Sequence, residues 1–222
     1  MKKSIGIIAT IAVLIIIVIL VKNNYKNLKN GNNISNKSID EIKEYILNIE
    51  SYTANAKIEI NSNKNKNTYI VEQKYIKATN SYNQKILEPE HLQGIEFTYD
   101  GTNLTIKNSQ LNLTKIYTDY KFIGSNELSL TKFIEDYKQN QETKIYEENE
   151  KVIMEVEVKT NNIYTQNKKL YISRETGTIE KMEIKDITQK TTIYILYNKI
   201  EINTLNNEEK IAFSIKLINE EI

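Results

Sequence analysis

The sequence predicts an α+β protein in which a transmembrane helix precedes a meander of antiparallel strands, with two helices on the concave face of the sheet. Three observations predict it. An apolar run occupies residues 5–21. Most of the chain beyond residue 51 alternates apolar and polar side chains with a period of two, as half-buried strands do. Residues 39–50 and 130–141 instead place apolar residues three and four apart, as amphipathic helices do, and such helices can cover the apolar face of a sheet.

The overall composition excludes several classes of function. The 222 residues carry a formal net charge of +1, with 30 basic and 29 acidic side chains spread along the chain. Proteins that bind nucleic acid usually present a basic face or stripe, so we expect no nucleic-acid partner. The chain has no cysteine, which removes disulfides, thiol catalysis, cysteine zinc sites and lipid attachment at a lipobox.

Residues 1–22 are predicted to form an uncleaved membrane anchor. Lys2 and Lys3 precede the apolar run Ile5–Val21, whose 17 residues span about 26 Å as a helix, close to the ~30 Å hydrocarbon core of a bilayer. The alternative is a cleaved signal peptide, but such a peptide ends in small residues at its cleavage site, and this run meets Lys22 directly. Because long domains are translocated largely regardless of charge, we expect a single-pass protein with its C-terminal domain outside the cytoplasm.

A polar tether, residues 23–37, is predicted to lead into a β-rich domain, residues 38–222. The domain begins with a helix, because Ser38 and Glu41 match the capping box that starts many helices. The predicted helix runs to about Glu50. One apolar stripe along it would pack on the sheet, and it consists of Ile39, Ile42, Ile46 and Ile49.

The next part of the domain is predicted to be a series of hairpins. Pro89, the only proline, breaks the chain, and Asp100-Gly101 predicts a tight turn because glycine accepts a positive φ without cost. The sole histidine, His91, lies between these two features. The predicted strands are 52–60, 69–76, 82–87, 95–99, 102–108 and 111–117, with a loop at 61–67.

The second helix is predicted from the apolar spacing of Leu130, Phe133, Ile134 and Tyr137, and Glu127 near its start suits the positive end of a helix dipole. Strands follow again. They are predicted at 152–158, 168–173, 178–186 and 192–203, with an edge strand at 210–218. A bulge is expected between Ile179 and Met182, where the alternation slips. One face of the strand 192–203 is predicted to carry Tyr194, Leu196, Ile200 and Ile202.

No group of residues predicts catalysis. Glu88 and Glu90 flank His91 and could bind a divalent cation weakly, but one imidazole and two flexible carboxylates do not fix a closed site, so we interpret them as a solvated turn. Glu155 and Glu157, two residues apart, would share the solvated face of a strand. The chain has neither a glycine-rich phosphate loop nor a Gly-x-Ser-x-Gly elbow. We therefore predict no enzyme, no catalytic residues, no cofactor and no metal, and the residues that bind a partner stay unidentified.

Several turn and strand motifs recur along the domain: Tyr75-Ile-Lys, Lys85-Ile-Leu-Glu-Pro89, the stretch from Gly94 to Asn108, and the later run from Leu170 to Asn203 with its Glu-Thr-Gly turn. Together these motifs resemble the LolA-like family, and within it the clostridial GerS and GerS-related germination lipoproteins. The resemblance covers roughly Ser38 to the C-terminus, and its motifs are turn and strand signatures.

The resemblance implies a curved, half-open antiparallel β-barrel with two helices covering its concave face. It also implies a role in sporulation and germination, as a non-enzymatic partner of the CwlD-type cortex amidase in muramic-δ-lactam formation. The lipobox cysteine is missing, and an uncleaved Ile5–Val21 helix would replace the lipid. The alternative is a carrier of lipid or lipoprotein, with acyl chains in the concave cavity, although a permanent anchor argues against a shuttle. The sequence leaves a homodimer open.

Overall fold

The computed structural model describes residues 37–62, 64–120, 126–158, 162–206, 208–209 and 213. The predicted anchor and nearly all of the predicted tether lie outside the described residues, as does most of the predicted edge strand 210–218. Within the described part of the chain, no helix is long and apolar enough to cross a membrane.

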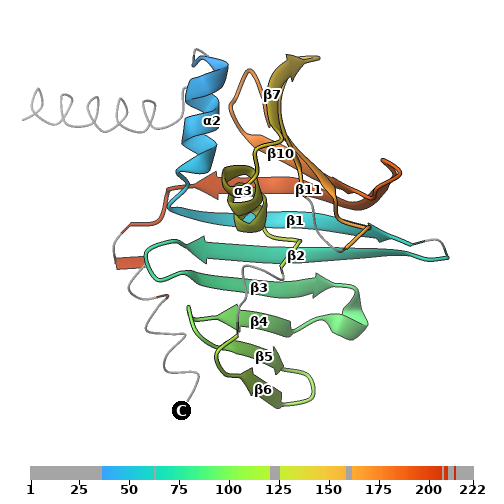
Figure 1. Cartoon of the computed structure of the whole chain (residues 1–222). Helices are drawn as coiled ribbons and strands as arrows, with labels where there is room; N and C mark the ends of the chain where they lie inside the picture. The colour runs from blue at the N-terminus through green and yellow to red at the C-terminus, as the bar shows by residue number, and fades with distance from the viewer. Residues whose placement is uncertain are drawn as a thin grey trace, which may run out of the picture.

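The described residues form one antiparallel sheet of 11 strands, in the order β6-β5-β4-β3-β2-β1-β11-β10-β9-β8-β7. Its two halves are successive hairpins that meet where β1 pairs with β11. Both helices lie on one side of the sheet, and β7 and β10 rise steeply beside them (Figure 1). The open antiparallel sheet with two helices is thus confirmed. The strands are β1 Ser51–Asn61, β2 Lys66–Ile76, β3 Ser81–Glu88, β4 Ile95–Tyr99, β5 Leu104–Asn108, β6 Leu113–Tyr117, β7 Thr143–Glu148, β8 Lys151–Glu157, β9 Asn167–Ser173, β10 Ile179–Lys185 and β11 Thr191–Ile202.

Helix α2, Ile39–Leu47, begins with the predicted capping box. The Glu41 amide donates to Ser38 Oγ at 3.2 Å, and the Ser38 amide donates to Glu41 Oε2 at 2.7 Å. The helix ends earlier than predicted because Asn48 turns its side-chain amide back onto the Glu44 carbonyl at 2.9 Å. Its predicted apolar stripe is confirmed, with Ile42, Ile46 and Ile49 buried against the sheet.

Helix α3, Leu130–Gln139, is capped by Ser129, whose Oγ accepts from the Lys132 amide at 3.1 Å. Leu130 and Phe133 are fully buried, and Tyr137 packs its ring 5.9 Å from that of Phe133. The predicted amphipathic helix is therefore confirmed, with its apolar side in the same core as α2.

The predicted hairpin at Asp100-Gly101 exists, but its loop has four residues, because Tyr99 pairs with Leu104. The Asp100 carboxylate accepts from the amides of the third and fourth loop residues at 2.7 Å, which stabilises the wider turn. Gly101 has φ +108°, and a Cβ there would lie 2.7 Å from the Thr79 carbonyl oxygen. The turn therefore needs glycine for both conformation and space.

The prediction that Tyr194, Leu196, Ile200 and Ile202 share one face of β11 is wrong. The register between β1 and β11 shifts between Asn55 and Ala56, which pair with Lys199 and Tyr197, so Asn198 is left over as a bulge. A bulge changes which alternate residues face inward. Leu196 is consequently 37% exposed, and the residues of β11 that reach the core are Ile193, Ile195, Tyr197 and Ile202. The bulge predicted in β10 is confirmed by a register shift between Ile179 and Lys181.

Strand β7, Thr143–Glu148, was not predicted. Only two of its side chains, Ile145 and Tyr146, are apolar, and they are adjacent, so the segment shows no alternation. It is a strand because it pairs along its whole length with β8. This pairing extends the sheet by one edge strand that local sequence does not signal.

Candidate functional site

A cavity of about 810 Å³ opens at one end of the sheet. Four segments that are distant in sequence surround it: the β1–β2 hairpin, the residues before α3, the β8–β9 connection and the β10–β11 turn. Its lining residues include Ile60, Asn61, Lys64, Asn126, Glu127, Leu128, Tyr164, Thr165, Asp186, Lys190, Thr192 and Ile193.

Most of the accessible surface of the cavity wall is apolar, although polar and charged side chains also line it. Ile60, Leu128 and Ile193 contribute aliphatic surface. The Thr192 hydroxyl already has hydrogen-bond partners, because it lies 2.7 Å from the Tyr164 carbonyl oxygen and 3.2 Å from the Ile184 carbonyl oxygen. Such a wall suits a ligand that is largely apolar.

The side chain of Thr165 differs from that of Thr192. Its side chain is buried, and its hydroxyl has no hydrogen-bond partner within the described part of the chain. A buried hydroxyl without a partner costs free energy, roughly 1–3 kcal/mol, unless a ligand or water satisfies it.

The segment before α3 is fixed to the sheet by a buried polar network. The Gln73 side-chain amide donates to the Leu128 carbonyl at 3.3 Å and to Gln84 Oε1 at 3.0 Å. The Tyr82 hydroxyl donates to the same Gln84 oxygen at 2.9 Å. Burial raises the pKa of Tyr82 well above its usual value, so this donor keeps its proton. One wall of the cavity is consequently held in place by hydrogen bonds to the sheet.

A buried ion-pair network lies directly behind the same wall. Lys168 on β9 is 1% exposed and donates to Asp136 Oδ2 of α3 at 2.5 Å and to Glu127 Oε2 of the cavity wall. Asp136 also accepts from Lys132 at 2.6 Å. These charges neutralise one another, and they connect α3, the cavity wall and β9.

Sequence reasoning missed this network, although it left a signal. Lys168 alternates in phase with Leu170 and Ile172, both fully buried, so it occupies an inward position of its strand. Asp136 follows Phe133 by three residues on the apolar side of α3. Two opposite charges at inward positions of different elements would have predicted a buried pair. Glu127, expected to serve the dipole of α3, instead pairs with Lys168.

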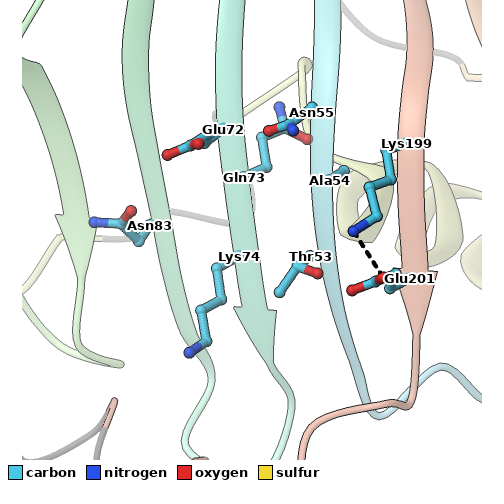
Figure 2. Close-up of a pocket in the computed structure, with 9 residues that line it drawn as sticks. All are labelled: Thr53, Ala54, Asn55, Glu72, Gln73, Lys74, Asn83, Lys199 and Glu201. Carbon is cyan, nitrogen blue, oxygen red and sulfur yellow. Dashed lines mark ion pairs between the residues drawn. The ribbon is translucent and has the colours of Figure 1, made fainter.

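A second, smaller hollow of about 290 Å³ lies over β3, β2, β1 and β11. Figure 2 shows polar side chains from these strands around it, and Lys199 pairs with Glu201 at 2.9 Å. It adjoins the bulge at Asn198, where the register of β11 shifts. Its other polar side chains are Thr53, Asn55, Glu72, Lys74 and Asn83. Its size and polarity suit water rather than an organic ligand.

The residues that the sequence offered for chemistry are dispersed. Glu88, Glu90 and His91 lie at the exposed 3₁₀ turn Glu90–Leu92, and in the described ranges no group of three or more histidine or carboxylate side chains could hold a metal. Glu155 is partly buried, which opposes its ionisation, but hydrogen bonds from Asn167 and Lys169 hold its pKa below the usual value. It therefore belongs to an ion pair on the sheet surface.

The edge strand β6 presents a different kind of surface. All five of its residues are exposed, and no strand pairs with its outer side within the described part of the chain. Four exposed apolar side chains gather on it and on the turn before it: Leu111, Leu113, Ile116 and Tyr117. The other edge strand, β7, instead exposes the charged side chains of Lys144, Glu147 and Glu148. Charges on an edge discourage pairing with other chains, and β6 carries one exposed charge, Lys115, among its exposed apolar side chains.

Comparison with known family models and with curated proteins found no match. Solved structures do resemble the chain. One is an uncharacterized conserved protein from Thermus thermophilus, with 10% identity, a TM-score of 0.49, and coverage of 78% of this chain and 92% of that one. Another is in the complex of the CwlD amidase with the GerS lipoprotein from Clostridioides difficile, with 24% identity, a TM-score of 0.46, and coverage of 73% and 92%.

A third is the LolA superfamily protein NE2245 from Nitrosomonas europaea, with 11% identity, a TM-score of 0.40, and coverage of 78% and 96%. The structural neighbours include LolA-like proteins. The likeness to them is one of fold. In this chain the open sheet with two helices on one face leaves two surfaces for binding, the cavity and the edge strand β6.

Proposed function

We propose that this protein is a membrane-anchored, non-enzymatic binding protein of a spore-forming bacterium, and that it docks and supports a CwlD-type cortex amidase in muramic-δ-lactam formation. The observation that carries the binding role is the edge strand β6, with its exposed apolar side chains and an outer side that no strand pairs within the described residues. The class of partner comes from the motifs that resemble GerS-related proteins. The domain would act outside the cytoplasm, held there by the Ile5–Val21 helix.

The edge strand β6 is suited to a protein partner for two reasons. Its outer backbone N–H and C=O groups can pair with a strand of another chain, which supplies main-chain hydrogen bonds. Its apolar side chains, Leu113 (61% exposed), Ile116 and Tyr117, would be buried in the same contact. Exposed apolar groups clustered in this way commonly mark interaction sites.

Substitution on β6 tests this surface. We expect the double variant Leu113→Lys/Ile116→Lys to bind the amidase of the same organism at least about 30-fold more weakly, because the two apolar contacts together are expected to contribute about 2 kcal/mol or more. The measurement is co-purification and titration of the full-length protein with the amidase. Ile187→Lys is the matched control, since Ile187 is also 61% exposed but lies away from β6. Absence of a complex at micromolar concentrations, with normal cortex lactam in a deletion strain, would reject the proposal.

A second function, lipid or lipoprotein binding, is favoured by the cavity. Its volume of about 810 Å³ falls within the range of small-molecule sites, and its aliphatic wall suits an acyl chain. In this role an anchored protein would sense or present a lipid locally.

Filling the cavity tests the second function. We expect Leu128→Trp to reduce binding of a fluorescent fatty acid to the full-length protein at least about tenfold, because the larger ring occupies space the ligand needs. Leu113→Trp, at an exposed site on β6, should bind as the unmodified protein does. Native mass spectrometry that finds no co-purified lipid, together with no fatty-acid binding, would count against this function.

A further inference from the structure

The mouth of the cavity is bordered by exposed apolar side chains. Ile163 and Tyr164 of the β8–β9 connection are 49% and 59% exposed, and Ile187 of the β10–β11 turn is 61% exposed. The two segments touch, since the Ile187 amide donates to the Ile163 carbonyl at 3.0 Å. Three large apolar groups thus project into solvent around one opening.

The backbone beneath these side chains is well fixed. The Asp186 carboxylate accepts from the amides of Thr188 and Lys190 at 2.8 and 3.0 Å, which closes the β10–β11 turn. The Tyr164 carbonyl accepts from the Thr192 hydroxyl at 2.7 Å. The projection of the apolar groups is therefore a property of ordered turns.

The accessible charges around the mouth are two lysines and one carboxylate. Lys64 and Lys190 line the cavity and are exposed. Of the two carboxylates of the lining, Glu127 pairs with the buried Lys168, and Asp186 is partly exposed and accepts hydrogen bonds from the amides of its own turn. A group that approaches the mouth meets two lysine ammonium groups and the Asp186 carboxylate beside three apolar side chains.

We propose that these five residues, Ile163, Tyr164, Ile187, Lys64 and Lys190, form a rim that docks on the surface of an anionic lipid bilayer. The inference rests on the part of the proposed function that places the chain at a membrane. Aromatic side chains lie favourably at the headgroup level, and lysines reach the phosphates while their methylene groups stay near the apolar boundary. Basic residues near an anionic leaflet add to the attraction.

A bilayer suits this rim better than a protein partner does. A stable protein interface buries about 800 Å² on each side with complementary shape, whereas the rim consists of side chains on turn tips around a hole. A fluid bilayer needs no complementary shape, and a few inserted side chains are enough to bind a protein that is already tethered. The edge strand β6 is separated from the rim by strands β5 to β1 of the sheet, so a protein partner and a membrane need not compete.

The predicted tether allows this contact. The 15 residues from Asn23 to Lys37 reach at most about 54 Å when extended, and their root-mean-square length is about 20 Å. Tethering at this length gives an effective concentration of the order of millimolar, so a weak rim contact would still orient the domain. The cavity mouth would then face the lipid, which gives an amphiphile a path to the cavity that avoids water.

Because the chain has no native cysteine, a single introduced cysteine can be labelled specifically. Ile187→Cys, labelled with an environment-sensitive fluorophore, would be compared with Leu113→Cys, whose native side chain has the same exposure of 61%. The full-length protein would be placed in vesicles of phosphatidylcholine with phosphatidylglycerol. We expect lipid-attached quenchers to quench the label at position 187 at least about twofold more than the label at 113. Equal quenching at the two positions would overturn the proposal.

Two further comparisons test the role of the lysines and the effect of a protein partner. We expect the difference in quenching between the labels at 187 and 113 to be smaller in the variant Lys64→Gln/Lys190→Gln, and also in vesicles of phosphatidylcholine alone. An unchanged difference would overturn the role of the lysines. Added amidase should change the label at 113 and leave that at 187 unaffected. A response at 187 only when amidase is present would make the rim a protein surface and overturn the proposal. Flotation of the full chain with vesicles reports on the anchor separately from the rim.

Discussion

Replacing Asp136 by leucine is expected to lower the free energy of unfolding by about 3–5 kcal/mol, the usual cost of removing one partner of a buried ion pair. The Asp136 carboxylate accepts from Lys168 at 2.5 Å and from Lys132 at 2.6 Å. Without it, Lys168 is left at 1% exposure with Glu127 as its one remaining carboxylate within the described part of the chain. Urea denaturation of the variant and the unmodified protein measures the loss.

A double-mutant cycle separates the ion pair from simple packing. Asp136→Leu combined with Lys168→Met should lose less stability than the sum of the single changes, with a coupling of about 1–3 kcal/mol, because the double variant leaves no unpaired lysine in the core. The control is Asp40→Ala in the pair that Asp40 forms with Lys43 on α2, where the Asp40 side chain is 82% exposed. That change should cost less than about 1 kcal/mol. Additive effects at positions 136 and 168 would contradict a buried ion pair between these two side chains.

Alkaline pH is expected to unfold the domain through its buried tyrosines. Burial raises the pKa of Tyr52, Tyr82 and Tyr197 well above the usual value and that of Tyr75 to about 12. Above pH ~10 the unfolded chain releases these protons while the folded chain keeps them, so stability falls as pH rises towards the folded pKa values. Together, four such groups lower the free energy of unfolding by about 5 kcal/mol for each pH unit. A typical free energy of unfolding of roughly 5–15 kcal/mol is therefore lost by about pH 12. Urea titrations between pH 8 and pH 11.5 measure this loss of stability, and tyrosinate absorbance reports the ionisation of the tyrosines.

Two tyrosine variants serve as controls for the alkaline transition. The Tyr197 hydroxyl has no hydrogen-bond partner within the described residues, so Tyr197→Phe removes a titrating group with little other change. It should reduce the loss by about 1.4 kcal/mol per pH unit. Tyr164→Phe, at an exposed position, should leave the slope unchanged. A slope that Tyr197→Phe does not alter would show that other groups drive the transition.

Local sequence was sufficient for most of the secondary structure. Ser38 and Glu41 start α2, and the spacing of Leu130, Phe133 and Tyr137 gives α3, because caps and apolar stripes act within a few residues. Alternation located β1 to β6 and β8 to β11 within a few residues, since one face of each strand must be buried. These features need no knowledge of the partner strands.

Local sequence failed where a strand depends on its neighbour. Strand β7 has no alternation and exists because β8 pairs with it, and the inward face of β11 depends on the bulge at Asn198, which is set by its register against β1. The candidate site was beyond local reasoning for the same reason. Four segments between residues 60 and 193 form the cavity, and the rim unites Lys64 with Tyr164 and Ile187.

The sequence by itself determined that this is a meander of antiparallel strands with two capped amphipathic helices, because periodicity and turn chemistry are short-range properties of the chain. The hairpin between Pro89 and Asn108 is the clearest example, although its turn proved wider than the Asp100-Gly101 pair predicts. Only the tertiary structure decided that Lys168 would be buried between Asp136 and Glu127, and that one edge of the sheet would be apolar and open. Such outcomes depend on which distant segments meet, and the free energy of burying a charge or leaving an edge exposed is set by those meetings.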